Sequence, residues 1–180
     1  MSRVIYDFSN ENFVVTGASS GMGRQVVVEL AAAGANVLAI ARNEARLQEL
    51  QYQYPNNISV AALDVCDSEK MENAIKNFVG ENGKLHGGVH AAGITDITPL
   101  KSYDKDRAHK IMDVNFWAGA IFLQYATKRE FLMMVHPLCC FLLCTPSHLL
   151  KECLYMVLPR RELILRCNPL VRRLPRESNA

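Results

Sequence analysis

The sequence predicts an α/β fold in which helices cover both faces of a doubly wound parallel sheet, giving three αβα layers. Short apolar runs alternate with segments whose apolar residues recur at helical spacing, as in consecutive βαβ units with right-handed crossovers. A glycine-rich turn joins the first apolar run to the first helical segment. A chain of 180 residues normally forms one domain with a buried core. The regular pattern ends near residue 129, so we expect a domain at 1–129 that is incomplete in its C-terminal half.

The glycine-rich turn reads T-G-A-S-S-G-M-G at residues 16–23. Residues 13–15 form a short buried strand before it, and apolar positions at helical spacing follow it. Gly17 permits the tight turn, Gly21 lets the backbone approach a phosphate, and Gly23 allows close packing of helix and strand. The free N–H groups at the helix N-terminus favour an anion. The pattern therefore predicts a cradle for the pyrophosphate of a dinucleotide, with a purely structural turn as the alternative.

Three more strands and three more helices are expected before residue 130. The apolar runs predict strands at 37–41, 59–63 and 88–91. Asn43 and Asp67 are candidate N-caps, because a short polar side chain accepts a hydrogen bond from first-turn N–H groups. The helices that they begin should end before Pro55 and near Gly80. One long helix is expected over 104–128, with an apolar face of Ile111, Val114, Ala118, Phe122 and Ala126.

The T-G-x-x-x-G-x-G spacing and the residues at the ends of the later strands resemble the short-chain dehydrogenase/reductase family. These residues are Arg42 after the second strand, Asp64 and Val65 after the third, His90, Ala91, Ala92 and Gly93 at the end of the fourth, and Asn115 in the long helix. The resemblance covers about residues 5–128. It implies a Rossmann-type domain for a dinucleotide cofactor, and an intact enzyme that interconverts an alcohol and a small carbonyl compound by hydride transfer.

The resemblance also implies which residues hold the cofactor. The phosphates would lie on Gly17, Ser19, Ser20, Gly21, Met22 and Gly23, the adenine near Asp64 and Val65, and the rest of the nucleotide along Ala91, Ala92 and Gly93. Arg42 stands where an acidic residue would bind the ribose hydroxyl of NAD, and a cation there favours the extra phosphate of NADP. We therefore expect NADP rather than NAD, with a solvated surface arginine as the alternative. For Asp64, the alternative is a cap at the approach to the next helix.

Two further polar residues stand in apolar segments. His90 ends a buried strand where the family usually has asparagine, so we expect it to hydrogen-bond the backbone rather than act as a base or metal ligand. No metal site is expected. Asn115 lies on a largely apolar helix, where an amide needs partners. The resemblance implies a catalytic role for Asn115, that of holding a water in the proton relay.

The sequence lacks the residues that carry out the chemistry of the resembling enzymes. Those enzymes use a Tyr as general acid/base, a Lys four residues later that lowers its pKa, and a Ser about 13 residues earlier that orients the carbonyl. Tyr125 is followed at the fourth position by Arg129, and Tyr155 by Pro159. Neither tyrosine has a Ser at the required position before it. We therefore expect a truncated, catalytically impaired form.

The sequence changes character near residue 130. None of the 10 glycines lies after Gly119, whereas five of the 6 cysteines and five of the 7 prolines follow Glu130. The net charge changes from −2 over 1–130 to +4 over 131–180. When the codons from Val135 onward are read one base out of frame, one permitted back-translation contains the Ser, Tyr and Lys of the family at their usual spacing. The Tyr and Lys stand in a Y-G-A-S-K segment of that translation. We expect a frameshift near residue 129 and an out-of-frame tail, without a defined domain, over 130–180.

Composition limits the other classes of function. A net charge of +2 gives no indication of nucleic acid binding. One cysteine in the first 130 residues fits the reducing cytosol, and the polar first 12 residues do not form a leader, so a cytoplasmic location is expected. Residues 131–150 carry no charged side chain, but their prolines and histidines disfavour a membrane span.

Two expectations concern partners and the alternative function. The intact relatives are expected to form homo-oligomers, whereas the oligomeric state of this chain cannot be read from the sequence. The tail cysteines have no C-x-x-C spacing and do not indicate zinc. The alternative function is a non-catalytic dinucleotide-binding or interaction protein, which would bind NADP without turnover.

Overall fold

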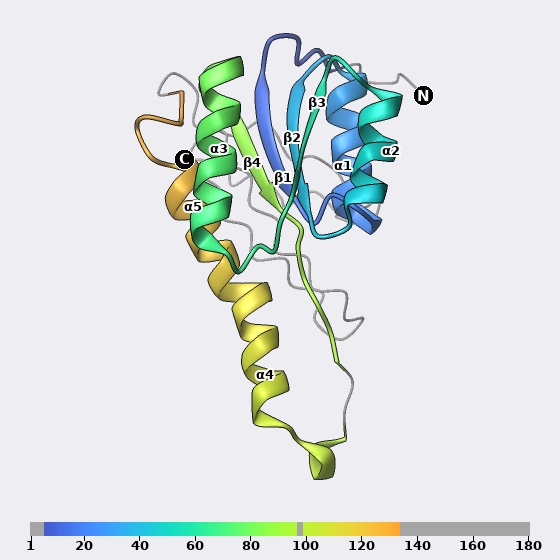
Figure 1. Ribbon diagram of the computed structural model, residues 1–180, viewed down its shortest axis with the longest axis vertical. Coiled ribbons are helices and arrows are strands. Elements are labelled where there is room, and N and C mark those ends of the chain that lie inside the picture. The colour runs from blue at the N-terminus through green and yellow to red at the C-terminus, as the bar shows by residue number, and fades with distance from the viewer. Residues whose placement is uncertain (1–5, 97–98, 134–180) are drawn as a thin grey trace, which may run out of the picture.

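The computed structural model describes residues 6–96 and 99–133, and its centre is a parallel four-stranded sheet (Figure 1). The strand order is β3-β2-β1-β4, and all pairs of neighbours are parallel. The strands are β1 (Asn12–Thr16), β2 (Asn36–Ala41), β3 (Ile58–Ala62) and β4 (Gly87–His90). This order is that of the first four strands of a doubly wound dinucleotide-binding sheet. The predicted α/β class is confirmed.

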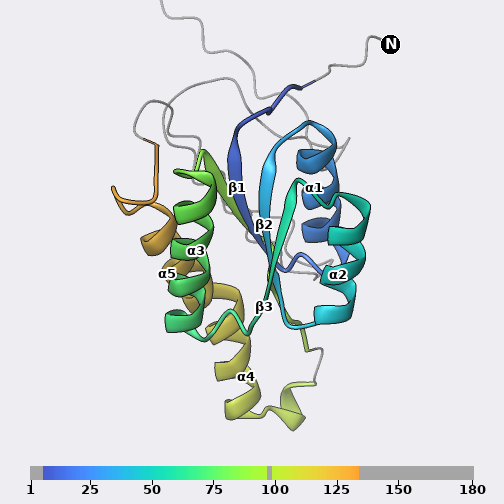
Figure 2. The ribbon, with the colours of Figure 1, turned by 45° about the horizontal axis from the view of Figure 1, so that its top comes forward.

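Helices cover both faces of the sheet and give the three expected layers (Figures 1 and 2). One face carries α1 (Gly21–Ala32) and α2 (Glu44–Gln53), and the other carries α3 (Ser68–Asn82) and α5 (Ala118–Ala126). A short 3-10 turn, η1 (Leu100–Ser102), leads into α4 (Lys105–Met112). Figure 1 shows α4 extending beyond the edge of the sheet, and none of its residues is buried.

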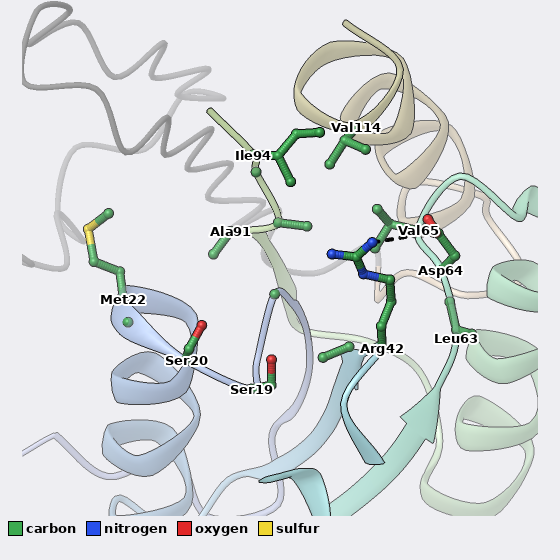
Figure 3. Close-up of a pocket in the computed structure, with 15 residues that line it drawn as sticks. Ser19, Ser20, Met22, Arg42, Leu63, Asp64, Val65, Ala91, Ile94 and Val114 are labelled. Atoms are coloured by element: carbon green, nitrogen blue, oxygen red, sulfur yellow. Dashed lines mark ion pairs between the residues drawn. The ribbon is translucent and has the colours of Figure 1, made fainter. Parts of the chain in front are cut away.

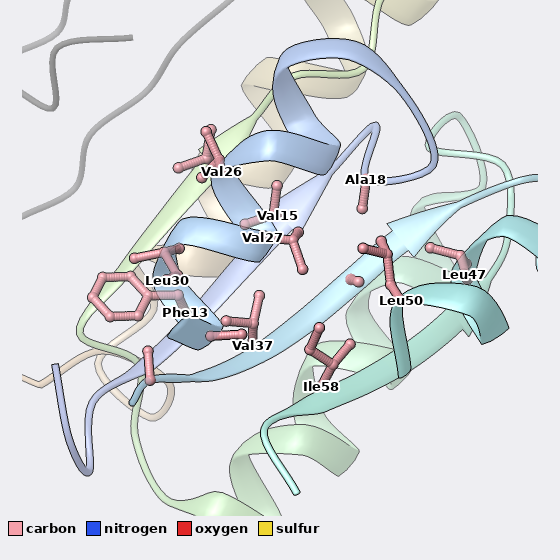
Figure 4. Packing of buried hydrophobic residues seen from close by; sticks show 14 of the residues in the cluster. Phe13, Val15, Ala18, Val26, Val27, Leu30, Val37, Leu47, Leu50 and Ile58 are labelled. Carbon is pink, nitrogen blue, oxygen red and sulfur yellow. The ribbon is translucent and has the colours of Figure 1, made fainter. Parts of the chain in front are cut away.

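The core beneath α1 and α2 follows the alternation of strand side chains between the two faces of a sheet. Figure 4 shows this packing. The strands contribute Phe13, Val15, Val37, Ala39 and Ile58, and the helices contribute Val26, Val27, Leu30, Leu47 and Leu50. Burying a valine or leucine side chain contributes about 1.5–3 kcal/mol, so this cluster stabilises the N-terminal βαβ units.

The core beneath α3 and α5 takes the alternate strand residues. It contains Val14, Leu38 and Ile40 from the strands, Met71, Ile75 and Phe78 from α3, and Val114, Ala118, Phe122 and Ala126 from the predicted apolar helix face. Gly88 makes room for the ring of Phe122, because a Cβ atom there would lie 2.9 Å from Cζ of Phe122. The fully buried Phe122 therefore lies directly on β4.

Helix starts agree with the predicted caps. Asn43 Oδ1 accepts a hydrogen bond from the Arg46 N–H at 3.1 Å, and Asp67 Oδ1 accepts one from the Lys70 N–H at 3.1 Å. These bonds satisfy N–H groups that lack a partner within the helix.

The long helix predicted over 104–128 is confirmed as one continuous helical run over residues 105–126, but it is not α-helical throughout. A π-helical segment, η2 (Asp113–Trp117), separates α4 from α5. Asn115 lies in this segment, and its side-chain amide bonds the backbone of Ile94 after β4. A π turn inserts an extra residue into a helix and is frequent at functional sites. A long-range contact therefore coincides with the interruption that the apolar periodicity did not reveal.

The chain remains packed beyond the predicted end of the resemblance at residue 128. Leu85 and Leu132 form a parallel bridge, in which the Leu85 N–H donates to the Phe131 carbonyl at 2.7 Å and the Met133 N–H donates to the Leu85 carbonyl at 2.9 Å. Lys128 contacts Glu72 and lies 4.8 Å from the centre of the Tyr125 ring. The expected out-of-frame tail falls almost entirely on residues 134–180, outside the described residues. Within the described residues, β4 is an edge strand whose far side is bridged just before it begins.

Candidate cofactor site

A cavity of about 270 Å³ lies at the carboxyl ends of the four strands (Figure 3). In an open parallel sheet this edge is where ligands bind. Its walls are the turn after β1, the residues that follow β2 and β3, the segment after β4, and one residue of η2. The lining residues are Gly17, Ser19, Ser20, Gly21, Met22, Ala41, Arg42, Leu63, Asp64, Val65, Ala91, Ala92, Gly93, Ile94 and Val114. All the residues predicted to hold the cofactor line this cavity except Gly23.

The glycines of the first turn are required by its geometry. Gly17 has φ +69°, and a Cβ atom there would lie 2.5 Å from the carbonyl oxygen of Ala91. Gly23 does not line the cavity because it packs inward, where a Cβ atom would lie 2.4 Å from the Gly17 carbonyl oxygen. Gly21 has φ +55° and open space where a Cβ atom would be. The turn therefore presses against the end of β4 while leaving room on its cavity side.

The first turn of α1 offers its backbone to the cavity. Ser20 is the N-cap of α1, and its side chain makes no capping hydrogen bond. Ser19, Ser20 and Met22 have side chains at the cavity wall (Figure 3). No acidic residue lies in the first turn of α1. The positive end of the helix dipole is thus left for an external anion.

A cation and a carboxylate face each other on the opposite side of the cavity. Arg42 follows β2, Asp64 follows β3, and Nη1 of Arg42 lies 4.0 Å from Oδ2 of Asp64 (Figure 3). The other carboxylate oxygen of Asp64 accepts a hydrogen bond from the Cys66 N–H at 3.0 Å. Both interpretations of Asp64 therefore have a structural counterpart, because its side chain caps the local turn and also lines the cavity.

His90 lies beneath the cavity rather than in it. It is fully buried, and its Nδ1 atom lies 2.8 Å from the Thr16 hydroxyl, which also accepts a hydrogen bond from the Ala92 N–H at 3.4 Å. The Thr16 hydroxyl is thus one partner of the ring, and a hydrogen bond with the Val114 backbone agrees with the expected backbone contact. Burial lowers the pKa of His90 to about 4, a shift that the nearby Val114 backbone opposes. A neutral imidazole is therefore the native form at neutral pH.

Asn115 is engaged with the backbone that follows β4. Its Oδ1 atom accepts a hydrogen bond from the Ile94 N–H at 2.8 Å, and its amide donates to the Ile94 carbonyl at 2.9 Å. The side chain thus fixes η2 against the cavity segment, while the adjacent Val114 lines the cavity itself. The role of holding a relay water stays a prediction.

Sequence reasoning did not single out four cavity residues, namely Ala41, Leu63, Ile94 and Val114. Ala41 and Leu63 directly precede Arg42 and Asp64, so the rule that carboxyl ends meet at one edge could have found them. Val114 lies in η2, and its place on the predicted apolar helix face does not distinguish a cavity residue from a core residue. Within the described residues, no group of three acidic, histidine or cysteine side chains is placed to hold a metal ion.

Comparison with known proteins decides the family. The family model described as short chain dehydrogenase matches residues 11–133, which is more than half of the chain. The chain belongs to the short-chain dehydrogenase family. The match ends where the described residues end, five residues beyond the end that the motifs indicated. The packing of Leu132 against Leu85 agrees with this longer extent.

Two similar proteins are, by name, reductases of L-xylulose and D-erythrulose. L-xylulose reductase of Caenorhabditis elegans is 31% identical over 126 residues, covering 70% of this chain and 50% of the relative. D-erythrulose reductase of Gallus gallus is 34% identical over 111 residues, covering 62% of this chain and 43% of the relative. The chain thus spans about half the length of the curated relatives that it matches.

Solved structures show the same fold. A short-chain dehydrogenase/reductase from Mycobacterium ulcerans has a TM-score of 0.62 and 30% sequence identity, covering 69% of this chain and 47% of that chain. A member from Brucella melitensis has a TM-score of 0.66 at 22% identity, covering 68% and 53%. In the part of the chain that the structure describes, no helix has both the length and the apolar character needed to span a bilayer.

Proposed function

We propose that this chain binds NADP(H) in the cavity at the carboxyl ends of its strands. The observation that carries the proposal is the guanidinium of Arg42, which lies at the end of β2 on the cavity wall. The residue at this position selects between the ribose hydroxyl of NAD and the 2′-phosphate of NADP. A cation here supports NADP as the preferred cofactor.

The other cavity residues fit a dinucleotide. The turn at Gly17 and Gly21 and the N-terminus of α1 provide backbone N–H groups and a positive dipole for the pyrophosphate. Asp64 and Val65 would border the adenine, and the segment of Ala91, Ala92 and Gly93 would border the remaining nucleotide. When bound, the nicotinamide supplies or accepts a hydride, and the protein contributes its binding and orientation.

We propose that the complete enzyme type interconverts a small carbonyl compound and its alcohol, and that this chain is catalytically impaired. The named activities of the sugar reductases support this class of substrate for the complete type. Tyr125 is the tyrosine nearest in sequence to Asn115, but it does not line the cavity and packs beside Lys128. It is therefore no replacement for the general acid of the family.

The missing residues support a frameshift in the coding sequence. The family match and the packing at Leu132 extend to residue 133, so we place the change of frame after Met133 rather than near residue 129. Sequencing the coding DNA on both sides of codon 133 tests this proposal. An insertion or deletion that restores the Ser, Tyr and Lys spacing supports it, and a continuous frame with no such reading refutes it.

Cofactor preference is tested by reversing the charge at the end of β2. Arg42→Asp should weaken NADP binding by about 1–3 kcal/mol, the range for a hydrogen bond to a charged group, and leave NAD binding less affected. Isothermal calorimetry measures both affinities. Arg46→Asp on the exposed side of α2 removes the same charge outside the cavity and serves as the control. Equal affinities for both cofactors before and after the Arg42 change would contradict the assignment.

A non-catalytic dinucleotide-binding protein is the second candidate function, favoured by the formed cavity in a chain without the catalytic residues. It predicts NADP affinity without turnover.

We place the protein in the cytoplasm, on the basis of the single cysteine in its first 130 residues. The intact relatives are proposed to be homo-oligomers.

A further inference from the structure

We propose that Asp64 opposes Arg42 in cofactor selection, so that the site prefers NADP over NAD less strongly than the arginine alone would dictate. The inference rests on the proposed function, because it concerns the same subsite. It assigns Asp64 a role in specificity besides its contact with the adenine side of the cavity.

The two side chains share one part of the cavity wall. Arg42 Nη1 and Asp64 Oδ2 are 4.0 Å apart, and both residues line the cavity (Figure 3). The carboxylate cannot simply turn away, because its Oδ1 atom accepts the hydrogen bond from the Cys66 N–H at 3.0 Å. A phosphate that contacts the Arg42 guanidinium therefore also comes close to a fixed negative charge.

Asp64 holds the Arg42 side chain too weakly for its main effect to be the orientation of that arginine. The separation of 4.0 Å lies at the outer limit of a salt bridge, and the Arg42 and Asp64 side chains are 65% and 49% exposed. Exposed pairs of this kind hold their side chains only weakly. The charge of Asp64 acts on an anion without any contact, over a range of about 8–10 Å at ordinary ionic strength.

Two carboxylates, Asp64 and Asp113, give this end of the cavity a negative bias against the single charge of Arg42. Burial is the main cause that raises the pKa of the neighbouring Cys66 thiol, and the charges of Asp64 and Asp113 add to it. Arg42 acts in the opposite direction and does not cancel the shift. A doubly charged 2′-phosphate would experience this bias, whereas the neutral 2′-hydroxyl of NAD would not.

Asp64→Asn is the informative change, because asparagine keeps an oxygen that can accept from the Cys66 N–H and removes only the charge. We use 2′,5′-ADP and 5′-AMP as probes, since they differ in the 2′-phosphate alone. Calorimetry should show the ratio of the 2′,5′-ADP affinity to the 5′-AMP affinity rising about 3- to 10-fold in the variant, because any effect on the shared adenine cancels in this ratio. The gain should shrink as salt is added, because screening already weakens the repulsion in the unmodified chain.

Glu49→Gln is the matched control, because Glu49 is exposed on α2 and does not line the cavity. It removes one negative charge and should leave the ratio of the two affinities unchanged. An unchanged or lower ratio in Asp64→Asn overturns the inference alone, provided that the unmodified chain binds both probes. If neither protein binds either probe while circular dichroism shows a folded sample, the proposed function fails and the inference fails with it.

Discussion

Replacing the buried His90 should remove a pH dependence from the stability of the fold. Its imidazole is fully buried, and its Nδ1 atom contacts the Thr16 hydroxyl. Burial lowers the pKa from 6.5 to about 4. The folded state therefore excludes the proton that the unfolded chain accepts below about pH 6.5.

The sign and size of the effect follow from linkage. Between about pH 6.5 and pH 4 the unfolded state binds more protons than the folded state, so the free energy of unfolding falls as the pH falls. A shift from 6.5 to about 4 corresponds to about 3 kcal/mol, which is present above pH 6.5 and lost as the pH approaches 4. This is a large share of the about 5–15 kcal/mol that stabilises a typical domain.

Urea unfolding followed by far-ultraviolet circular dichroism measures this dependence between about pH 7.5 and pH 4.5. His90→Asn introduces the side chain usual in the family, which does not titrate in this range. The difference in free energy of unfolding between the two proteins should be constant above about pH 6.5. Below that pH, the unmodified chain should lose stability relative to His90→Asn by about 1.4 kcal/mol per pH unit. His109→Gln on the exposed α4 is the control for replacing a histidine by an amide away from the core. A flat difference between the unmodified chain and His90→Asn would show that the imidazole does not stay neutral, and the reasoning would be refuted.

Two further predictions concern the first turn and turnover. Gly17→Ala should abolish stable folding or nucleotide binding, because the added Cβ atom would meet the Ala91 carbonyl at 2.5 Å from a backbone with φ +69°. Gly80→Ala in α3 is the control, because Gly80 has open space for the methyl group, and it should raise the thermal midpoint by the equivalent of about 0.5–1 kcal/mol. If Gly17→Ala folds and binds nucleotide as normally as Gly80→Ala does, the assigned turn geometry is contradicted. The chain should show no measurable NADPH oxidation with small carbonyl compounds in a spectrophotometric assay, because general acid/base catalysis alone contributes about 10²–10⁴-fold. Turnover that survives Tyr125→Phe and Tyr155→Phe would point to a different catalytic group.

Local signals were sufficient for most of the fold. The four strands, the caps Asn43 and Asp67 and the glycine turn all depend on residues adjacent in sequence, and the structure agrees with each. The family resemblance assigned distant residues such as Arg42 and Asp64 to one cofactor, and the structure has both lining one cavity. The roles of the individual cavity residues stay predictions.

Signals that depend on distant partners were missed. The π turn coincides with the Asn115 amide bonding Ile94, 21 residues away, and no periodicity within the helix records that contact. The packing of residues 131–133 was missed because it depends on a bridge between Leu132 and Leu85, which are far apart in the sequence.

Binding and catalysis are separable in this chain because different parts of the sequence carry them. Every residue that lines the cavity precedes Ala118, and the buried residues of both described core clusters lie between Phe8 and Phe131. The general acid, its lysine and the orienting serine belong in relatives to a later segment, and no residue of this sequence has their spacing. A cofactor affinity close to that of complete enzymes, without turnover, would therefore place the damage in the chemistry alone. Loss of both would mean that the later segment also supports the cavity, most directly through the far side of β4.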